Sequence, residues 1–117
     1  MNHDLEKLIS LHDIDVMIDD LKHADIMEQE ESMGLSPDHA RAELARIREE
    51  LASGIRKRWL SLYQQLAGHY GNAVVPAVRD RCCGCLTRLP TAMCSDPDRN
   101  EEIHTCPTCG RIIYWAD

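Results

Sequence analysis

Apolar side chains recur at steps of three and four residues through the first part of the chain. One series runs through residues 5–21 and a second through residues 40–66, and this spacing places each series along one face of an α-helix. We therefore predict two helices, over about residues 3–33 and 37–70. The first series is Leu5, Leu8, Leu11, Ile14, Ile18 and Leu21, and the second is Ala40, Leu44, Ile47, Leu51, Ile55, Trp59, Leu62 and Leu66.

The segment MGLSPDHA, residues 33–40, separates the two series. Gly34 suits the left-handed position that ends a helix, Ser36 can cap the next helix, and Pro37 fits its first turn. A connection this short indicates that the second helix runs back along the first. We predict an antiparallel, coiled-coil helical hairpin as the first domain, residues 1–71.

The predicted hairpin buries a single seam, but its outer faces also carry apolar residues. Pairing of two copies into a four-helix arrangement would cover these residues, so we expect a homodimer through the helical hairpin. The outward-facing residues are Ile9, Val16, Met17 and Ile26.

The helical pattern ends near Gly71, and Pro76 prevents it from resuming. The later run RIIYW (residues 111–115) is β-branched and aromatic, as strands are, and EIHTC (residues 102–106) can pair with it as a hairpin. A small β-rich module over residues 72–117 therefore follows the helices. The predicted fold class is α plus a small β module.

Five of the six cysteines lie in or beside two stretches, DRCCGCLTRLP and HTCPTCGRIIYW. Cys82 and Cys85 form one C-x-x-C pair, and Cys106 and Cys109 form another. Each two-residue gap lets one tight turn aim two thiolates at a common point, and two such turns supply the four soft ligands of a tetrahedral zinc site. Gly110 suits the positive φ that such a turn needs. We predict a zinc ribbon with one structural Zn²⁺ bound by these four cysteines.

Two other uses of these thiols fit less well. A redox dithiol at Cys106 and Cys109 would be expected to precede a helix, whereas a strand-like run follows this pair. Disulfides require an oxidising compartment, but the N-terminus lacks a signal-peptide pattern, and no run approaches the roughly 18 apolar residues of a membrane span. We expect a cytoplasmic protein, in which thiols stay reduced.

The remaining candidate ligands have simpler roles. Cys83 could replace Cys82 only with a less suitable C-x-C spacing. Cys94 is expected to be a small buried apolar residue. His104 is a further candidate, but with four cysteines at hand we expect it on a strand surface.

We expect no enzymatic activity. Four protein ligands complete the tetrahedron and leave no position for a catalytic water. The sequence also contains no Ser/His/Asp set, no glycine-rich phosphate loop and no Glu beside a two-histidine metal motif.

The net charge of −7 does not favour nucleic acid as a partner. Residues 1–38 carry two Lys/Arg and eleven Asp/Glu, whereas residues 39–73 carry six and three, so an acidic helix is expected beside a more basic one. A nucleic-acid-binding zinc ribbon remains the alternative function, with Tyr114 or Trp115 stacking on bases. Its candidate phosphate contacts are Arg79, Arg81, Arg88, Arg99 and Arg111.

Residues 74–115 resemble the C-terminal module of a family of bacterial coiled-coil proteins that carry a four-cysteine zinc ribbon. The matching motifs are VVPAV, CCGC, LP, DPDRNEE and CPTCGRIIYW. Upstream the resemblance is only architectural, since this hairpin is shorter than the coil of the family. By position, the resemblance carries over only the four zinc ligands.

The resemblance implies an adaptor or regulatory protein that acts through protein–protein contacts. Some members of the family are tied to transcription through the enhancer-dependent sigma factor, and to flagellar or secretion regulation. Candidate contacts in the ribbon are Ile113, Trp115 and Arg111, although Trp115 could instead close the ribbon core. A further hypothesis places the acidic hairpin tip in a channel of RNA polymerase, as in other bacterial factors that pair a hairpin with a zinc finger. Its residues are Glu28, Glu30, Glu31 and Asp38.

Overall fold

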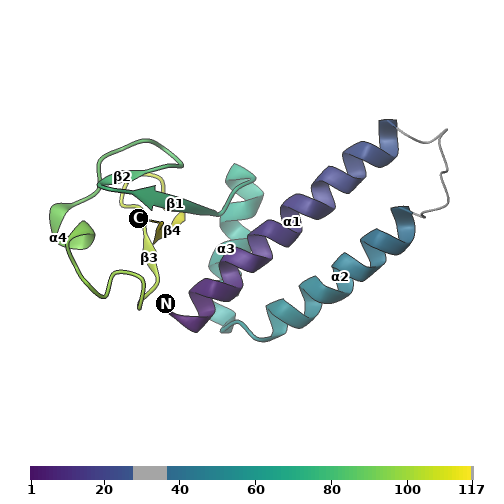
Figure 1. The fold of residues 1–117 in the computed structure, drawn as a ribbon, viewed down its shortest axis with the longest axis horizontal. Helices are drawn as coiled ribbons and strands as arrows, with labels where there is room; N and C mark the ends of the chain where they lie inside the picture. Colours follow the sequence, from purple (N-terminus) through teal and green to yellow (C-terminus); the bar gives the residue numbers. More distant parts are fainter. Residues whose placement is uncertain (28–36, 117) are drawn as a thin grey trace.

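The computed structural model describes residues 1–27 and 37–116. Within them, two helices lie side by side as an elongated arm, and a small sheet gathers at the other end of the molecule (Figure 1). The elements are α1 (His3–Met27), α2 (Pro37–Ser53), α3 (Lys57–Tyr70), β1 (Val74–Val78), β2 (Arg81–Cys82), α4 (Thr91–Cys94), β3 (His104–Thr105) and β4 (Ile112–Trp115). None of the described helices is long and apolar enough to cross a membrane.

The expected turn between the first two helices lies outside the described residues. This applies to the predicted cap residues Gly34 and Ser36, and to the acidic residues of the hairpin tip, Glu28, Glu30 and Glu31. The side chain of Asp38 is also outside the described part. Pro37 begins α2, as predicted for the first turn of that helix.

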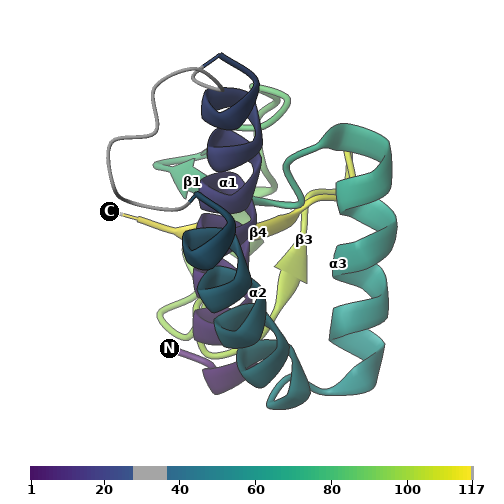
Figure 2. The same cartoon turned by 90° about the vertical axis from the view of Figure 1, so that its right-hand side faces the viewer.

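The prediction of one continuous helix over residues 37–70 is wrong, because the helix is interrupted at residues 54–56. The Gly54 N–H donates to the carbonyl of Leu51 at 3.1 Å, so the end of α2 tightens into a 3₁₀-type turn. Arg56 then takes an extended conformation (φ −58°, ψ 136°) before α3 begins. The chain therefore changes direction between α2 and α3, as Figures 1 and 2 show.

Two tertiary contacts accompany this break. Ile55 is only 6% exposed and lies in the main core, so the interruption turns its side chain inward. Lys7 on α1 donates from Nζ to the Gly54 carbonyl at 3.0 Å. A Cβ at position 54 would lie 2.9 Å from that nitrogen, so glycine permits this close approach.

The three helices share one network of polar side chains. Arg48 on α2 donates hydrogen bonds to the carboxylate of Asp15 on α1, and the hydroxyl of Tyr63 on α3 donates to the same carboxylate at 2.6 Å. Burial is the main cause that raises the pKa of Tyr63, and the hydrogen bond to Asp15 raises it further. A single carboxylate thus links α1, α2 and α3.

The sheet has four short strands in the order β2-β1-β4-β3. β3 pairs antiparallel with β4, which confirms the predicted hairpin between residues 102–106 and 111–115. β1 pairs with β4 in parallel, with Val74 opposite Ile112 and Ala77 opposite Trp115. This pairing brings the start of the β module against its end.

Two cores meet at β1. The main core lies between the helices and one face of the sheet, and it includes Val74 of β1 with Ile112 of β4. Val75 and Ala77 lie in the second core, inside the β module. The main core therefore has members on both sides of Gly71, the predicted domain boundary. Its helical members are Leu5, Leu8, Leu11, Ile55 and Tyr63.

We predict that Tyr63→Phe lowers the free energy of unfolding by about 1.5–3 kcal/mol, the usual contribution of a hydrogen bond to a charged group. The hydroxyl is lost without a large cavity, because the ring remains. Denaturant unfolding at pH 7 measures the change. Tyr70→Phe is the matched control and should cost about 1 kcal/mol or less, since that exposed hydroxyl donates to the neutral carbonyl of Cys109. Equal effects of the two variants would contradict the role of the network.

The same tyrosine predicts a loss of stability at alkaline pH. The folded state raises the pKa of Tyr63 above its usual value of 10.0, so it holds the phenol protonated more strongly than the unfolded chain does. The stabilisation is complete below that usual pKa and declines as the pH rises above it. Unfolding measured from pH 8 upwards should show a steeper decline for the wild type than for Tyr63→Phe. Parallel profiles would contradict this origin of the pH dependence.

Candidate metal centre

The two C-x-x-C pairs form two turns of the same construction. In the first, the N–H of Leu86 donates to the Cys82 carbonyl at 2.7 Å, and in the second the N–H of Gly110 donates to the Cys106 carbonyl at 2.8 Å. The residue after each pair has a positive φ, 65° at Leu86 and 80° at Gly110. The prediction for Gly110 is confirmed, whereas the first turn has leucine in the equivalent position.

The four predicted ligands come together at one point. Their sulfur atoms all lie within 4.8 Å of one another. The Cys82 and Cys109 Sγ atoms are 3.9 Å apart, and those of Cys85 and Cys106 are 3.7 Å apart. A tetrahedron of sulfurs about 2.3 Å from a zinc ion has edges of about 3.8 Å. The residues present therefore fit a four-coordinate metal with thiolate ligands.

The cluster is partly shielded from solvent, and this affects its thiols in opposite ways. Burial raises the pKa of Cys82 to about 12. Hydrogen bonds from the side chain and backbone of Thr87 lower the pKa of Cys85 to about 6. A bound dication would favour the thiolate form at all four positions, because its charge offsets the cost of burying them.

The end of α3 is tied directly to the second cysteine turn. The hydroxyl of Tyr70 donates to the Cys109 carbonyl at 2.7 Å, and the guanidinium of Arg111 lies over the Tyr70 ring at 3.9 Å. Arg111 Nε also donates to the carbonyl of Asn72 at 3.1 Å. Arg111 was expected to contact a partner, whereas it stacks on Tyr70, a role that the sequence does not reveal because no spacing rule places Tyr70 beside Cys109.

Ile113 and Trp115 were expected to contact a partner, but both side chains are buried. They share one face of β4, as expected, but they are 1% and 3% exposed and belong to the second core. Trp115 is also held by the side chain of Asn100. This side chain accepts a hydrogen bond from the backbone N–H of Trp115 at 2.8 Å and donates one to the backbone carbonyl of Trp115 at 2.9 Å. Trp115 therefore closes the ribbon core, which was the alternative stated for it.

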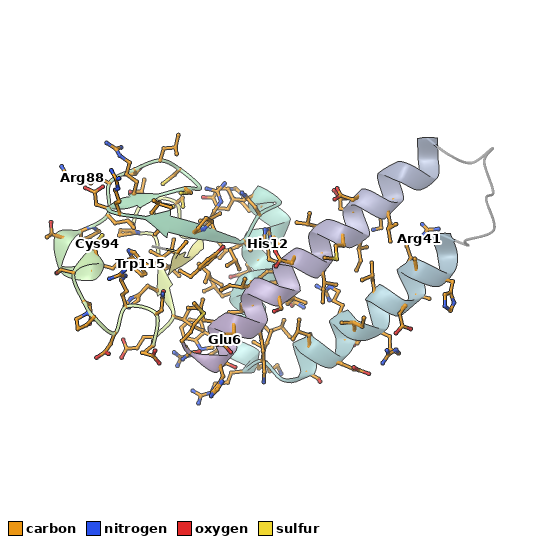
Figure 3. The ribbon with its side chains drawn as sticks, in the orientation of Figure 1. Glu6, His12, Arg41, Arg88, Cys94 and Trp115 are labelled. Atoms are coloured by element: carbon orange, nitrogen blue, oxygen red, sulfur yellow. The ribbon has the colours of Figure 1, made fainter. Side chains whose placement is uncertain are left out.

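The other candidate ligands lie outside the cluster. His104 is half-buried on β3, and its ring meets the Trp115 ring edge-on with centroids 5.8 Å apart. Cys83 is exposed. Cys94 is half-buried and packs against the second core, close to the role expected for it (Figure 3).

The candidate arginines have different surroundings. Arg111 stacks on Tyr70, and Arg99 lies 6.0 Å from the centre of the Trp115 ring. Arg88 lies at the outer edge of the module (Figure 3) and donates to Asp80 at 2.7 Å, which lowers the pKa of that carboxyl. Arg79, Arg81 and Arg88 are all exposed, so the exposed cations gather around the first cysteine turn.

Gly84→Ala tests the tie between α3 and the cysteine turns. An added Cβ would lie 2.9 Å from the Cδ and Nη1 atoms of Arg111 and 3.2 Å from Val75 Cγ2, so the Arg111 side chain must shift from its position over Tyr70. We expect a loss of about 1–3 kcal/mol, typical of overpacking. Gly68→Ala is the control: nothing lies within 4 Å of its Cβ position in α3, so it should stabilise the helix by about 0.5–1 kcal/mol. Thermal unfolding measures both, and a neutral Gly84→Ala would contradict the tie.

No protein-family model matches the chain, and no curated protein matches it. Among solved structures, it is similar to the HP0958 protein from Helicobacter pylori, with 23% identity and a TM-score of 0.62, and to CT398 from Chlamydia trachomatis, with 24% identity and a TM-score of 0.59. Each comparison covers 68% of this chain and 34% of the other, so the matched part spans about a third of those proteins. The chain thus shares a fold, over 68% of its length, with part of two bacterial proteins.

Proposed function

We propose that this chain is a non-enzymatic adaptor or regulatory protein that carries one structural zinc ion and acts through protein–protein contacts. The observation that carries the proposal is the convergence of four sulfurs, with separations of 3.7 and 3.9 Å between opposite turns. These separations match those of a tetrahedral thiolate site, whose four protein ligands leave no position for a substrate or a reactive water. A closed site of this kind supports structure rather than catalysis.

A tetrahedral set of four thiolates suits zinc, and it also suits iron. We assign zinc because it is the ordinary metal of closed four-cysteine structural sites, in which metal binding supplies much of the folding free energy. Cys82, Cys85, Cys106 and Cys109 would hold the ion. A bound ion would supply positive charge that offsets the repulsion among the four thiolates.

Metal analysis of the purified chain tests this assignment. We expect one zinc per chain. Cys85→Ser should lose the metal and the folded ribbon, because it removes one of the four ligands. Cys83→Ser is the matched control, since it changes the exposed neighbour within the same turn and should keep the zinc. Iron in place of zinc, or full zinc content in Cys85→Ser, would contradict the assignment.

The way the ribbon joins the helices supports an adaptor role. The start of α1 is tied to the ribbon where the Asn2 N–H donates to the Asn100 carbonyl at 2.8 Å, and the end of α3 is tied to it through Tyr70 and Cys109. The metal centre would thus hold two protein surfaces, the helical arm and the ribbon, in a fixed relation. A rigid pair of surfaces is what an adaptor presents to its partners.

The family resemblance of residues 74–115 suggests where such an adaptor acts. It points to the transcription machinery, through a sigma factor or RNA polymerase, or to flagellar or secretion components. The similar structures add a common fold over about a third of their length. The choice among these partners rests on the resemblance alone.

The alternative of nucleic-acid binding by the ribbon has less support. Trp115 is 3% exposed and cannot stack on a base without leaving the core. Arg88 is paired with Asp80, and Arg111 is stacked on Tyr70. Four thiolates with one Zn²⁺ would also add negative charge beside the remaining arginines, which weakens attraction for a phosphate backbone.

Affinity purification of the tagged chain from its native cells, with and without nuclease, tests the adaptor proposal. A sigma factor, polymerase or secretion component recovered from both samples with Cys83→Ser, but not with Cys85→Ser, is the expected result. It would show a protein partner that requires the folded ribbon. Partners that disappear with nuclease would instead favour the nucleic-acid alternative.

A further inference from the structure

Residues 78–88 lie at one edge of the β module, where β2 is the outermost strand, and we call them the ribbon finger. It contains the end of β1, the strand β2 and the first cysteine turn. Two of its apolar side chains are exposed: Val78 is 43% exposed and Leu86 is 68% exposed. Arg81 connects them, because it pairs with Val78 across the β1–β2 ladder and donates to the Leu86 carbonyl at 3.2 Å. The finger therefore presents apolar side chains among exposed arginines.

The backbone of the finger is strained in two places. Arg79 has a φ of 58° and Leu86 a φ of 65°, and within residues 1–27 and 37–116 they are the non-glycine residues with positive φ. Glycine adopts this conformation at much lower cost, and Gly110 does so in the second cysteine turn. Leu86 recovers little of that cost through packing, because most of its side chain is exposed. The positive φ belongs to the cysteine turn, but the turn does not require a leucine there, so an exposed leucine in place of glycine indicates a role for its side chain outside the fold.

A surface of opposite charge lies on α1. Val16 and Met17 are 44% and 52% exposed, whereas Leu5, Leu8 and Leu11 earlier in the same helix are fully buried. Asp13 and Asp20 are exposed and lie one turn before and after this pair, so all four side chains share one side of the helix. We call these four residues the α1 patch. Like the finger, the α1 patch has exposed apolar side chains between charged ones, but here the charges are negative.

We propose that the ribbon finger of one copy binds the α1 patch of a second copy. Leu86 and Val78 would cover Val16 and Met17, while arginines of the finger face the carboxylates of the α1 patch. Each copy carries both surfaces, so a two-fold axis would form the contact twice.

Two observations favour a second copy as the occupant of the finger. The exposed large apolar residues in the described part of the chain are Met1, Val16, Met17, Tyr70, Val78 and Leu86, and the two surfaces contain four of them. The arginines of the finger and the carboxylates of the α1 patch have opposite charges at close range, although a zinc–thiolate centre would add negative charge beside those arginines and the chain as a whole carries −7. The proposed contact keeps the homodimer expected from the sequence but changes its interface. The helical hairpin of one copy would meet the ribbon of the other, rather than its hairpin.

Sedimentation equilibrium of the full zinc-loaded chain tests the contact. The wild type should form a dimer whose dissociation constant rises with salt, because the charged rims are solvent-exposed. Leu86→Gly should raise that constant by about tenfold or more, since it removes an apolar contact made twice. The same change relieves the positive φ, so thermal unfolding at low protein concentration should show an unchanged or higher midpoint. This separates lost contact from lost fold.

A charge exchange provides the second arm. Arg81→Glu and Asp20→Arg should each weaken the dimer alone, and an equimolar mixture should associate again because both contacts then join opposite charges. Lys57→Glu, an exposed change on α3 outside both surfaces, should have no more than a small effect. A wild type that stays monomeric would overturn the proposal, and so would a dimer that Leu86→Gly leaves intact, as a hairpin-to-hairpin dimer would be. Neither result affects the adaptor function, which metal content and partner capture test separately.

Discussion

The parallel pairing of β1 with β4 is the constraint on which the rest of the structure depends. β1 leads through β2 into the first cysteine turn, and β4 follows directly from the second, so this pairing brings the two turns together. Alternation along β1 directs Val74 to the helices and Val75 to the ribbon core. One short strand is therefore a wall of both cores, and separating it from β4 would open the thiol cluster and remove the surface on which α1 packs.

The thiol cluster adds an electrostatic requirement to this geometry. Burial opposes ionisation of Cys82, whereas the hydrogen bonds of Thr87 favour it at Cys85. The protein alone does not supply the charge needed to hold four thiolates at these separations. Metal binding and closure of the ribbon are therefore expected to occur together, and the contacts of Tyr70 and Arg111 carry that rigidity to the end of α3.

Residue spacing and residue type predicted the features that depend on a few neighbouring residues. C-x-x-C spacing identified the four thiols that converge, and residue type predicted the β3–β4 hairpin. The break at Gly54 escaped detection because the apolar series continues through it, and one glycine lowers helix propensity by only about 1 kcal/mol. The break depends instead on the contact of Lys7 with the Gly54 carbonyl and on the packing of Ile55 in the main core. Both contacts involve residues that are distant in sequence. Trp115 was placed on the correct strand face, but only the folded module determines which face is covered.

The main core has a consequence for synthesis on the ribosome. Leu5, Leu8 and Leu11 belong to the earliest helix, yet the core that buries them is completed by Ile112 near the end of the chain. While the ribbon is still being translated, α1 can pair with α2 but lacks the wall that seals its apolar face. The nascent protein must therefore keep these leucines from other surfaces until β4 emerges. Chaperone demand is expected to be set by this interval rather than by the stability of the finished fold.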